Sequence, residues 1–159
     1  MSLDPREFRN ALGRFATGVT VITVNPKGMT PFGMTANSFA SVSLDPALVL
    51  WSIQKNSDCF TAFAQATQFG VNILSANQQA LSNQYAKKNE HNLVEGTFVQ
   101  GRSGCVVLKD AMVSFECDIE ARHEGGDHVI IVGRVREMTS HPAERKPLVF
   151  FAGRYRELK

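Results

Sequence analysis

The sequence predicts a mainly β protein, an antiparallel barrel or sandwich with a few short helices inserted between the strands. Short apolar runs rich in β-branched residues recur along the chain, and turn residues separate them. Within 112–138, two long strands flank the tetrapeptide Glu124–Asp127, and apolar side chains alternate from Val113 to Ala121. Alternation with a period of two is typical of a strand that buries one face.

The N-terminal segment carries the signals of a helix start. Asp4 can cap the helix, Pro5 suits its first turn and Glu7 completes a capping box. We expect this element to end at Gly18. The apolar residues that share one of its faces are Phe8, Leu12 and Phe15.

Two further helices are indicated by polar residues at their starts. The Asn-Ser-Asp run at 56–58 is expected to cap one of them, and the capping box from Ser75 to Gln78 opens another that reaches about Lys87. The polar, glycine-containing span 88–104 has no clear period, so we expect a loop there with freedom to move.

The remaining segments read as strands and turns. Turns are expected at Asn25–Gly28 and at Asp45-Pro46, where turn-forming residues cluster. The predicted strands are 19–24, 33–46 up to its closing turn, 48–53, 69–74, the pair within 112–138, and a last strand in 147–158 that ends in a charged tail.

The length and composition indicate a single domain with a packed core. A chain of 159 residues has the length of one domain, so we expect a single domain over 1–159, and 43% hydrophobic residues allow a packed core. The net charge is only +2 and the basic residues are scattered, which argues against nucleic acid or an anionic membrane as partner. No apolar run is long enough to span a membrane and no signal-peptide pattern is present, so we expect a cytoplasmic protein.

The number and spacing of the cysteines are typical of a protein in a reducing compartment. Cys59, Cys105 and Cys117 are odd in number, widely spaced and form no Cys-x-x-Cys motif. We therefore expect free thiols that pack as small buried hydrophobes.

A metal site is not expected. His123 and His128 flank the Gly-Gly turn with Asp127 beside them, but a zinc site needs ligands that converge on one point, usually with a fourth from elsewhere. The pattern is more typical of a solvated hairpin tip that carries one functional histidine.

Motifs for nucleophilic catalysis and for nucleotide binding are absent from the sequence. There is no Gly-x-Ser-x-Gly, no phosphate-binding loop and no Gly-x-Gly-x-x-Gly fingerprint. A nicotinamide nucleotide, if used, is therefore not held in the Rossmann manner.

Polar segments at strand ends are the remaining candidates. The stretch 33–46 carries hydroxyl and carboxamide groups, but its only carboxylate belongs to the closing turn, and the segment 52–57 is similarly polar. Such groups are suited to holding a phosphate and a heteroaromatic ring, and Ser57 lies where a helix is expected to begin. The structural alternative is that Ser57 only caps a helix, and that Asn37 and Ser38 only end a strand.

Six stretches together resemble the short-chain flavin reductases, the small components of two-component flavin-dependent monooxygenases. They cover nearly the whole chain in the expected order and are FRNALGRFATGVTVITV, GMTANSFASVSLDPALVLWSI, FGVNIL, LSNQYAK, FECDIEARHEGGDHVIIVGRV and LVFFAGRYREL. The resemblance implies an antiparallel, Greek-key-like, FMN-binding split β-barrel that forms a homodimer with flavin near the subunit interface. It also explains the polar segments, because a flavin carries the chemistry and needs positioning groups rather than a nucleophile.

The resemblance also implies site residues. Ser57 would meet the flavin phosphate, His128 would face the nicotinamide and the flavin as the one catalytic residue, and Tyr155 would border the nicotinamide pocket. Many relatives carry Ser-Ser-Thr or Ser-x-Thr in the phosphate loop, whereas here the run is Asn56-Ser57-Asp58-Cys59. The carboxylate of Asp58 would repel a phosphate unless it points away. The other implied flavin-binding residues are Met34, Thr35, Ala36, Asn37, Ser38, Ser52, Ile53, Gln54, Ala86 and Lys87.

The implied activity is that of an NAD(P)H:flavin oxidoreductase. A hydride would pass from NADH or NADPH to FMN or FAD, and the reduced flavin would serve a partner monooxygenase. The alternatives are a flavoprotein that keeps FMN and reduces another acceptor, a non-catalytic flavin-binding or storage protein and, more distantly, a haem-binding relative. The sequence does not choose between NADH and NADPH.

Overall fold

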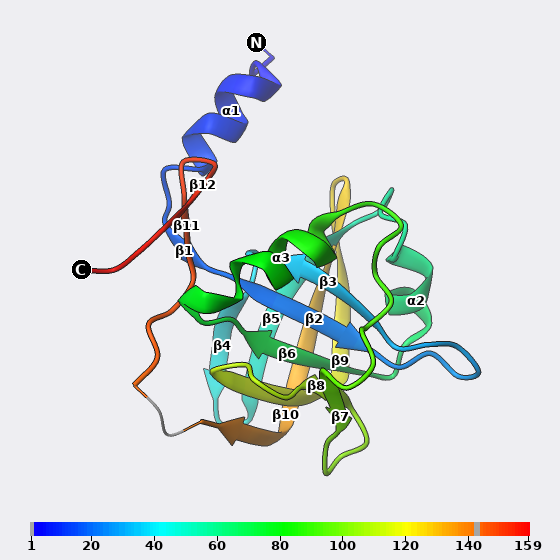
Figure 1. The fold of residues 1–159 in the computed structure, drawn as a ribbon. Helices are drawn as coiled ribbons and strands as arrows, with labels where there is room; N and C mark the ends of the chain where they lie inside the picture. The colour runs from blue at the N-terminus through cyan, green and yellow to red at the C-terminus, as the bar shows by residue number, and fades with distance from the viewer. Residues whose placement is uncertain (1, 142–143) are drawn as a thin grey trace.

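A computed structural model describes residues 2–141 and 144–159, and it is built around a seven-stranded antiparallel sheet (Figure 1). The strand order of this sheet is β3-β2-β6-β9-β10-β5-β4. Two smaller sheets, β1-β11-β12 and β7-β8, flank it. The strands are β1 (Thr17–Gly18), β2 (Thr20–Val24), β3 (Phe32–Ala36), β4 (Ala40–Leu44), β5 (Ala47–Gln54), β6 (Gln68–Ile73), β7 (Phe98–Gln100), β8 (Val106–Leu108), β9 (Val113–Gly125), β10 (His128–Ser140), β11 (Val149–Phe151) and β12 (Arg154–Arg156). The helices are α1 (Pro5–Leu12), α2 (Phe60–Gln65), the 3₁₀ turn η1 (Ala76–Gln78) and α3 (Gln79–Ala86).

The large sheet curls until its two edges meet. Strands β3 and β4 are its opposite edges, yet only residues 37–39 separate them along the chain. A flat sheet of this order would place its edges about 29 Å apart, whereas the four peptide steps from Ala36 to Ala40 reach at most about 14 Å. The chain can connect the edges only if the sheet closes on itself, which confirms the predicted split barrel.

The single strand predicted over 33–46 is therefore wrong. The segment forms two strands, β3 and β4, which pair with β2 and β5 respectively. Asn37 and Ser38, in the connection between them, are exposed. A strand pattern read along the chain does not reveal that its two halves pair on opposite edges.

The long hairpin is confirmed. Strands β9 and β10 are joined by Gly126 and Asp127, and Gly126 has a φ of 69°, which favours glycine. Their register shifts between Val132 and Gly133. A Cβ at Gly133 would lie 2.4 Å from the ring of Phe69, so glycine is needed for this close approach.

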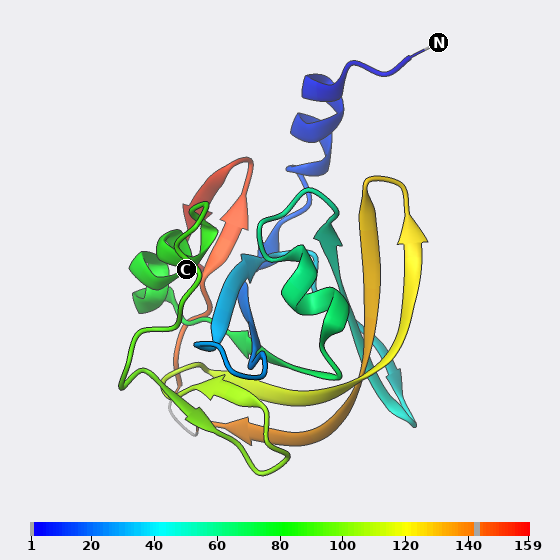
Figure 2. The same cartoon turned by 90° about the vertical axis from the view of Figure 1, so that its right-hand side faces the viewer.

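The first helix projects from the barrel (Figures 1 and 2), and its apolar side chains Phe8 and Leu12 are exposed. Asp4 caps it as predicted, accepting hydrogen bonds from the N–H groups of Arg6 at 2.8 Å and Glu7 at 2.9 Å. The helix ends at Leu12 with Gly13 as its C-cap, so the expected end at Gly18 is wrong. None of its residues is buried.

The predicted starts of the other helices have mixed outcomes. Helix α2 begins at Phe60 with Cys59 at the N-cap position and no side-chain cap, so the run 56–58 does not cap it. The capping box at Ser75 is confirmed, since its N–H donates to Gln78 Oε1 at 2.9 Å, although a 3₁₀ turn precedes α3.

Two segments are more ordered than the sequence indicates. The span 88–104 contains β7, which pairs with β8, and its start is fastened to the barrel because Leu93 N–H donates to Pro31 O at 2.8 Å. The segment 147–158 is a hairpin, β11–β12, that pairs with β1 rather than one strand and a tail.

The three cysteines are free and buried, as predicted. Burial raises the pKa of the Cys59 and Cys117 thiols to about 12, so neither is poised to react as a thiolate. Cys59 and Cys117 belong to the core inside the barrel, and a second core lies between β2, β8 and α3.

Candidate flavin site

The closure of the barrel brings two of the predicted flavin segments together. Ser52 N–H donates to Ser38 Oγ at 3.0 Å, and Ser38 Oγ lies 3.2 Å from Ser52 O, to which it donates. The connection 37–39 is thereby tied to β5, and the side chains of Asn37 and Gln54 are left exposed. The carboxamide groups of Asn37 and Gln54 are therefore exposed on neighbouring parts of the barrel end.

His128 lies at the same end of the barrel. It is the first residue of β10 and is opposite Gln54 of β5. Its Nδ1 lies 2.7 Å from Asp127 Oδ1, and this hydrogen bond is the largest of the contributions that hold the pKa of Asp127 below its ordinary value. Because an ionised carboxylate only accepts, Nδ1 carries the proton and Nε2 is left for a ligand.

The tip of the β9–β10 hairpin is fastened to the end of β5. Lys55 N–H donates to Asp127 O at 2.9 Å, and the Lys55 ammonium pairs with Glu124. These contacts fix the position of His128 relative to Gln54, one of the predicted flavin residues.

Ser57 lies in a turn beyond β5 rather than at a helix start. Its N–H donates to Gln54 O at 3.0 Å, and its Oγ accepts from Cys59 N–H at 3.2 Å. The hydroxyl proton is then free to donate to a phosphate oxygen. The helix dipole expected to assist it is not available, because α2 begins only at Phe60.

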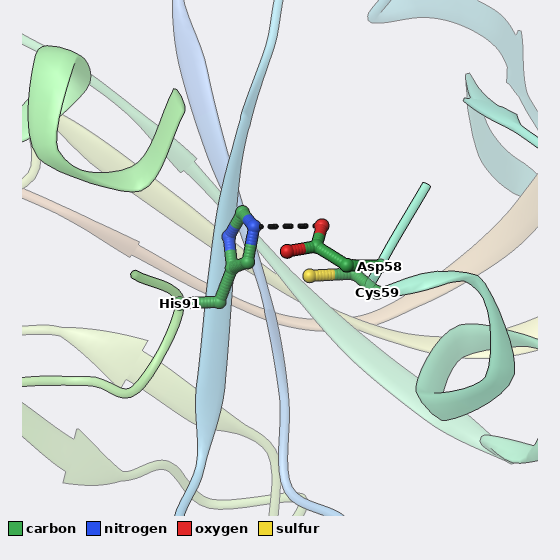
Figure 3. A group of neighbouring side chains, drawn as sticks. All are labelled: Asp58, Cys59 and His91. Carbon is green, nitrogen blue, oxygen red and sulfur yellow. Dashed lines mark hydrogen bonds and ion pairs between the residues drawn. The ribbon is translucent and has the colours of Figure 1, made fainter. Parts of the chain in front are cut away.

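The carboxylate of Asp58 faces His91, in the segment after α3 (Figure 3). Its Oδ2 accepts from Asn89 N–H at 2.6 Å, and its Oδ1 lies 3.0 Å from His91 Nε2. Burial alone would raise the pKa of Asp58, but the Asn89 N–H together with the charge and hydrogen bond of His91 holds it below its ordinary value. The bond to Asn89 also brings Ser57 close to the predicted segment that includes Lys87.

Other predicted residues have structural partners. Thr35 Oγ1 donates to Ser82 O at 2.6 Å, which ties β3 to α3, the helix that ends at Ala86. Ile53 is only 1% exposed as a whole residue and belongs to the barrel core. Met34 and Ala36 are half-buried on β3.

Tyr155 is tied to α3. Its hydroxyl lies 2.7 Å from Ser82 Oγ and 3.0 Å from Asn83 Oδ1, and its ring packs edge-on against Phe150. Strand β12, which carries Tyr155, stands apart from the β9–β10 tip in both views (Figures 1 and 2). Within one chain, Tyr155 and His128 are therefore not brought together.

A cavity of about 530 Å³ lies between the β2–β3 turn, α2 and the β7–β8 hairpin, and it contains none of the predicted site residues. A smaller cavity of about 210 Å³ beside the β9–β10 tip is lined by one of them, Ile53, together with His123 and Glu124. The exposed residues Asn37 and Gln54 line neither cavity.

The ligand-type residues that do converge were not foreseen from the sequence. Side-chain atoms of Asp58, Cys59 and His91 lie within 4.8 Å of one another. The only sequence signal for His91 is that it is polar within a polar loop, since its partner is distant in the chain. At the hairpin tip, by contrast, His123 is exposed on β9.

The architecture is that of a split barrel that binds flavin, and the comparisons agree with it. A model of the flavin reductase like domain matches residues 12–159, and the chain belongs to this family. The chain is 45% identical over 132 residues to the "Probable flavin reductase" of Rhizobium meliloti (strain 1021), a match that covers 83% of this chain but 42% of that protein. The chain thus spans less than half the length of this relative.

Other relatives match over most of their length. The FMN reductase (NADH) SmoA of Agrobacterium fabrum is 45% identical over 153 residues, covering 96% of this chain and 85% of SmoA. HsaB of Rhodococcus jostii, the reductase subunit of a flavin-dependent monooxygenase, is 35% identical over 154 residues, covering 97% and 78%. The solved structure of the NADH:FAD oxidoreductase SgcE6 of Streptomyces globisporus, in complex with NAD and FAD fragments, superposes with a TM-score of 0.90 at 36% identity, covering 100% and 97%.

These matches confirm the expected fold and the expected enzyme class, a flavin reductase that uses flavin and a nicotinamide nucleotide. Among the described residues, no helix is both long and apolar enough to cross a membrane.

Proposed function

We propose that this chain transfers a hydride from NADH to FMN and releases the reduced flavin to a separate monooxygenase. The observation that supports the proposal is the linkage of the predicted segments: Ser38 bonds Ser52, and Gln54 is paired with His128 and bonded by the Ser57 N–H. The names of SmoA and HsaB support the choice of NADH, FMN and an oxygenase partner. A steady-state assay that crosses NADH and NADPH with FMN, FAD and riboflavin tests it, and NADH with FMN should give the highest kcat/KM.

The residues divide between holding the flavin and presenting the nicotinamide. Asn37, Ser38 and Gln54 would contact the ring and its tail, with the small side chain of Ala36 allowing close approach. Ser57 and Lys87 would contact the phosphate, and His128 Nε2 would orient the nicotinamide. A bound flavin supplies the electron-accepting chemistry, so these residues need only bind, orient and exclude water.

Ser57→Ala should weaken FMN binding about tenfold, because a hydrogen bond to a charged group contributes about 1.5 kcal/mol at the lower end of its range. The rate at saturating flavin should change less than about twofold, since a contact made equally before and during the reaction affects binding alone. Fluorescence titration and steady-state kinetics measure the two effects. Ser140→Ala, exposed at the far end of β10, is the matched control. A slower reaction at saturating FMN with unchanged affinity would contradict the assignment.

We also propose that the protein is a homodimer. Phe8, Leu12 and Phe15 are 50%, 60% and 81% exposed along α1 and the turn after it, and a second copy would cover them. A dimer would also allow Tyr155 of one chain to approach the site of the other. Light scattering should give twice the chain mass of 17.5 kDa, and Phe8→Glu should shift the mass toward one chain. A monomer mass for the unaltered protein at micromolar concentration would refute the dimer.

The three free thiols support a further proposal, that the protein works in the reducing cytoplasm. Loss of activity on transfer to a reducing buffer would argue against it.

A further inference from the structure

The carboxylate of Asp58 is fully engaged by residues from another segment. One oxygen accepts from Asn89 N–H at 2.6 Å and the other lies 3.0 Å from His91 Nε2. Figure 3 shows the carboxylate facing the imidazole ring. Asp58 follows Ser57 directly in the chain. The direction of its carboxylate therefore affects how much negative charge lies near the flavin phosphate proposed to bind at Ser57.

Both ring nitrogens of His91 lie beside acceptor oxygens. Its Nδ1 lies 3.0 Å from Gly33 O, and a carbonyl oxygen can only accept. Its Nε2 faces an ionised carboxylate, which also only accepts. Both ring nitrogens therefore face acceptors, an arrangement in which only the imidazolium form can donate two hydrogen bonds. The side chain is 12% exposed, so water screens this pair less than a surface pair.

The other charged groups nearby do not replace His91. Lys87 and Glu90 pair with each other, with 3.9 Å between Nζ and Oε2, and both are largely exposed. Without His91, Asp58 would keep neutral backbone donors, such as the Asn89 N–H, and would present an unbalanced negative charge close to Ser57.

We propose that His91 determines the affinity for the phosphate end of the flavin, because it neutralises Asp58 and fixes the direction of its carboxylate. His91 is a positioning residue that acts through Asp58 and does not touch the flavin. This inference rests on the proposed function, which places the phosphate at Ser57 and Lys87. Two like charges about 7 Å apart repel enough to change affinity roughly tenfold when they are partly screened.

A metal site is the rival explanation of the same cluster, because Cys59 Sγ lies within 4.8 Å of the ligand-type atoms of Asp58 and His91. Zinc binds the thiolate form of cysteine. Burial, reinforced by the charge of Asp58, raises the pKa of the Cys59 thiol to about 12, and Asp58 already has two donors. The ion pair accounts for the arrangement without a metal.

The test compares FMN with riboflavin, which lacks the phosphate. His91→Gln should weaken FMN binding about tenfold and leave riboflavin binding within about twofold, and the FMN effect should shrink in high salt. The double variant Asp58→Asn/His91→Gln should restore FMN binding, because the charge to be neutralised is gone. His141→Gln, whose Nε2 bonds Lys109 O at the other end of β10, is the control.

Several results would overturn the proposal. Equal weakening of FMN and riboflavin in His91→Gln would show a merely structural role, as would a double variant that stays weak. If His91→Gln does not fold, Asp58→Asn alone decides, since it should bind FMN at least as tightly as the unaltered protein, and a tenfold loss would refute the idea. One zinc ion per purified chain, whose removal by chelator reproduces the loss, would establish the metal site instead. Equal affinity of the unaltered protein for both flavins would overturn this inference, while reduction of both flavins by NADH would leave the reductase proposal standing.

Discussion

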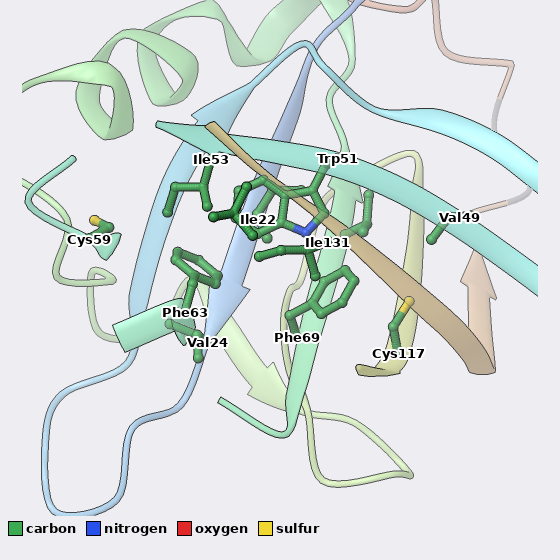
Figure 4. Packing of buried hydrophobic residues seen from close by; sticks show 12 residues of the cluster. Ile22, Val24, Val49, Trp51, Ile53, Cys59, Phe63, Phe69, Cys117 and Ile131 are labelled. Atoms are coloured by element: carbon green, nitrogen blue, oxygen red, sulfur yellow. The ribbon is translucent and has the colours of Figure 1, made fainter. Parts of the chain in front are cut away.

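Trp51→Ala should lower the free energy of unfolding by about 3–5 kcal/mol, the usual cost of emptying a large aromatic site in a core. Trp51 is fully buried at the centre of the barrel, surrounded by the side chains in Figure 4. Its ring meets Phe63 edge-on at 4.9 Å between centroids and Phe69 at 6.0 Å. Its Nε1 has no hydrogen-bond partner among the described residues, so the loss comes from packing and the cavity rather than from an orphaned polar group.

Urea unfolding followed by circular dichroism, at one fixed protein concentration, measures this loss. Trp51→Phe is the matched control, because it keeps a flat aromatic ring and should cost clearly less. A loss below about 1 kcal/mol for Trp51→Ala would mean that the barrel interior collapses around the gap, contrary to a rigidly packed core.

His128→Ala should lower kcat/KM for NADH about a hundredfold, the order of loss expected when a reacting group is misplaced by about 1 Å. The Asp127 bond and the Lys55–Asp127 bond hold the imidazole in place, so its removal should disturb the nicotinamide and not the flavin. We expect FMN affinity to change less than about twofold. Fluorescence titration of FMN and stopped-flow reduction at several NADH concentrations separate the two effects.

His123→Ala is the control for this variant, since His123 is exposed on the neighbouring strand and should leave both quantities unchanged. If His128→Ala chiefly loses FMN while the reduction rate is kept, the assignment of the two segments is reversed. No change at all would make His128 a structural residue.

The parts of the fold that could be predicted are those written in local patterns. Alternation identified β9, the Gly-Gly turn identified its hairpin with β10, and Asp4 and Ser75 identified two helix starts, because strand faces, turns and caps depend on residues close in sequence. The same reasoning gave a wrong prediction for the stretch 33–46, which forms two strands. Whether β3 and β4 continue or separate depends on their partners β2 and β5, which local pattern does not encode.

The candidate site also has a part that could be predicted from the sequence and a part that only the structure reveals. The resemblance located the polar segments, and the structure explains their proximity through the Ser38–Ser52 and His128–Gln54 contacts. It also resolves the difficulty posed by Asp58, whose partners Asn89 and His91 lie about thirty residues further along the chain. Only the tertiary fold brings His91 within 3.0 Å of the carboxylate next to Ser57.

Anaerobic stopped-flow mixing of the FMN-loaded protein with NADH tests the central claim most directly, because it observes both reactants. The account predicts that NADH absorbance and oxidised-flavin absorbance fall together, one for one, and that NADH is stable when FMN is omitted. Gel filtration of the product should separate the reduced flavin from the protein. Flavin that binds but stays oxidised in the presence of NADH, or NADH consumption without any flavin, would contradict the account.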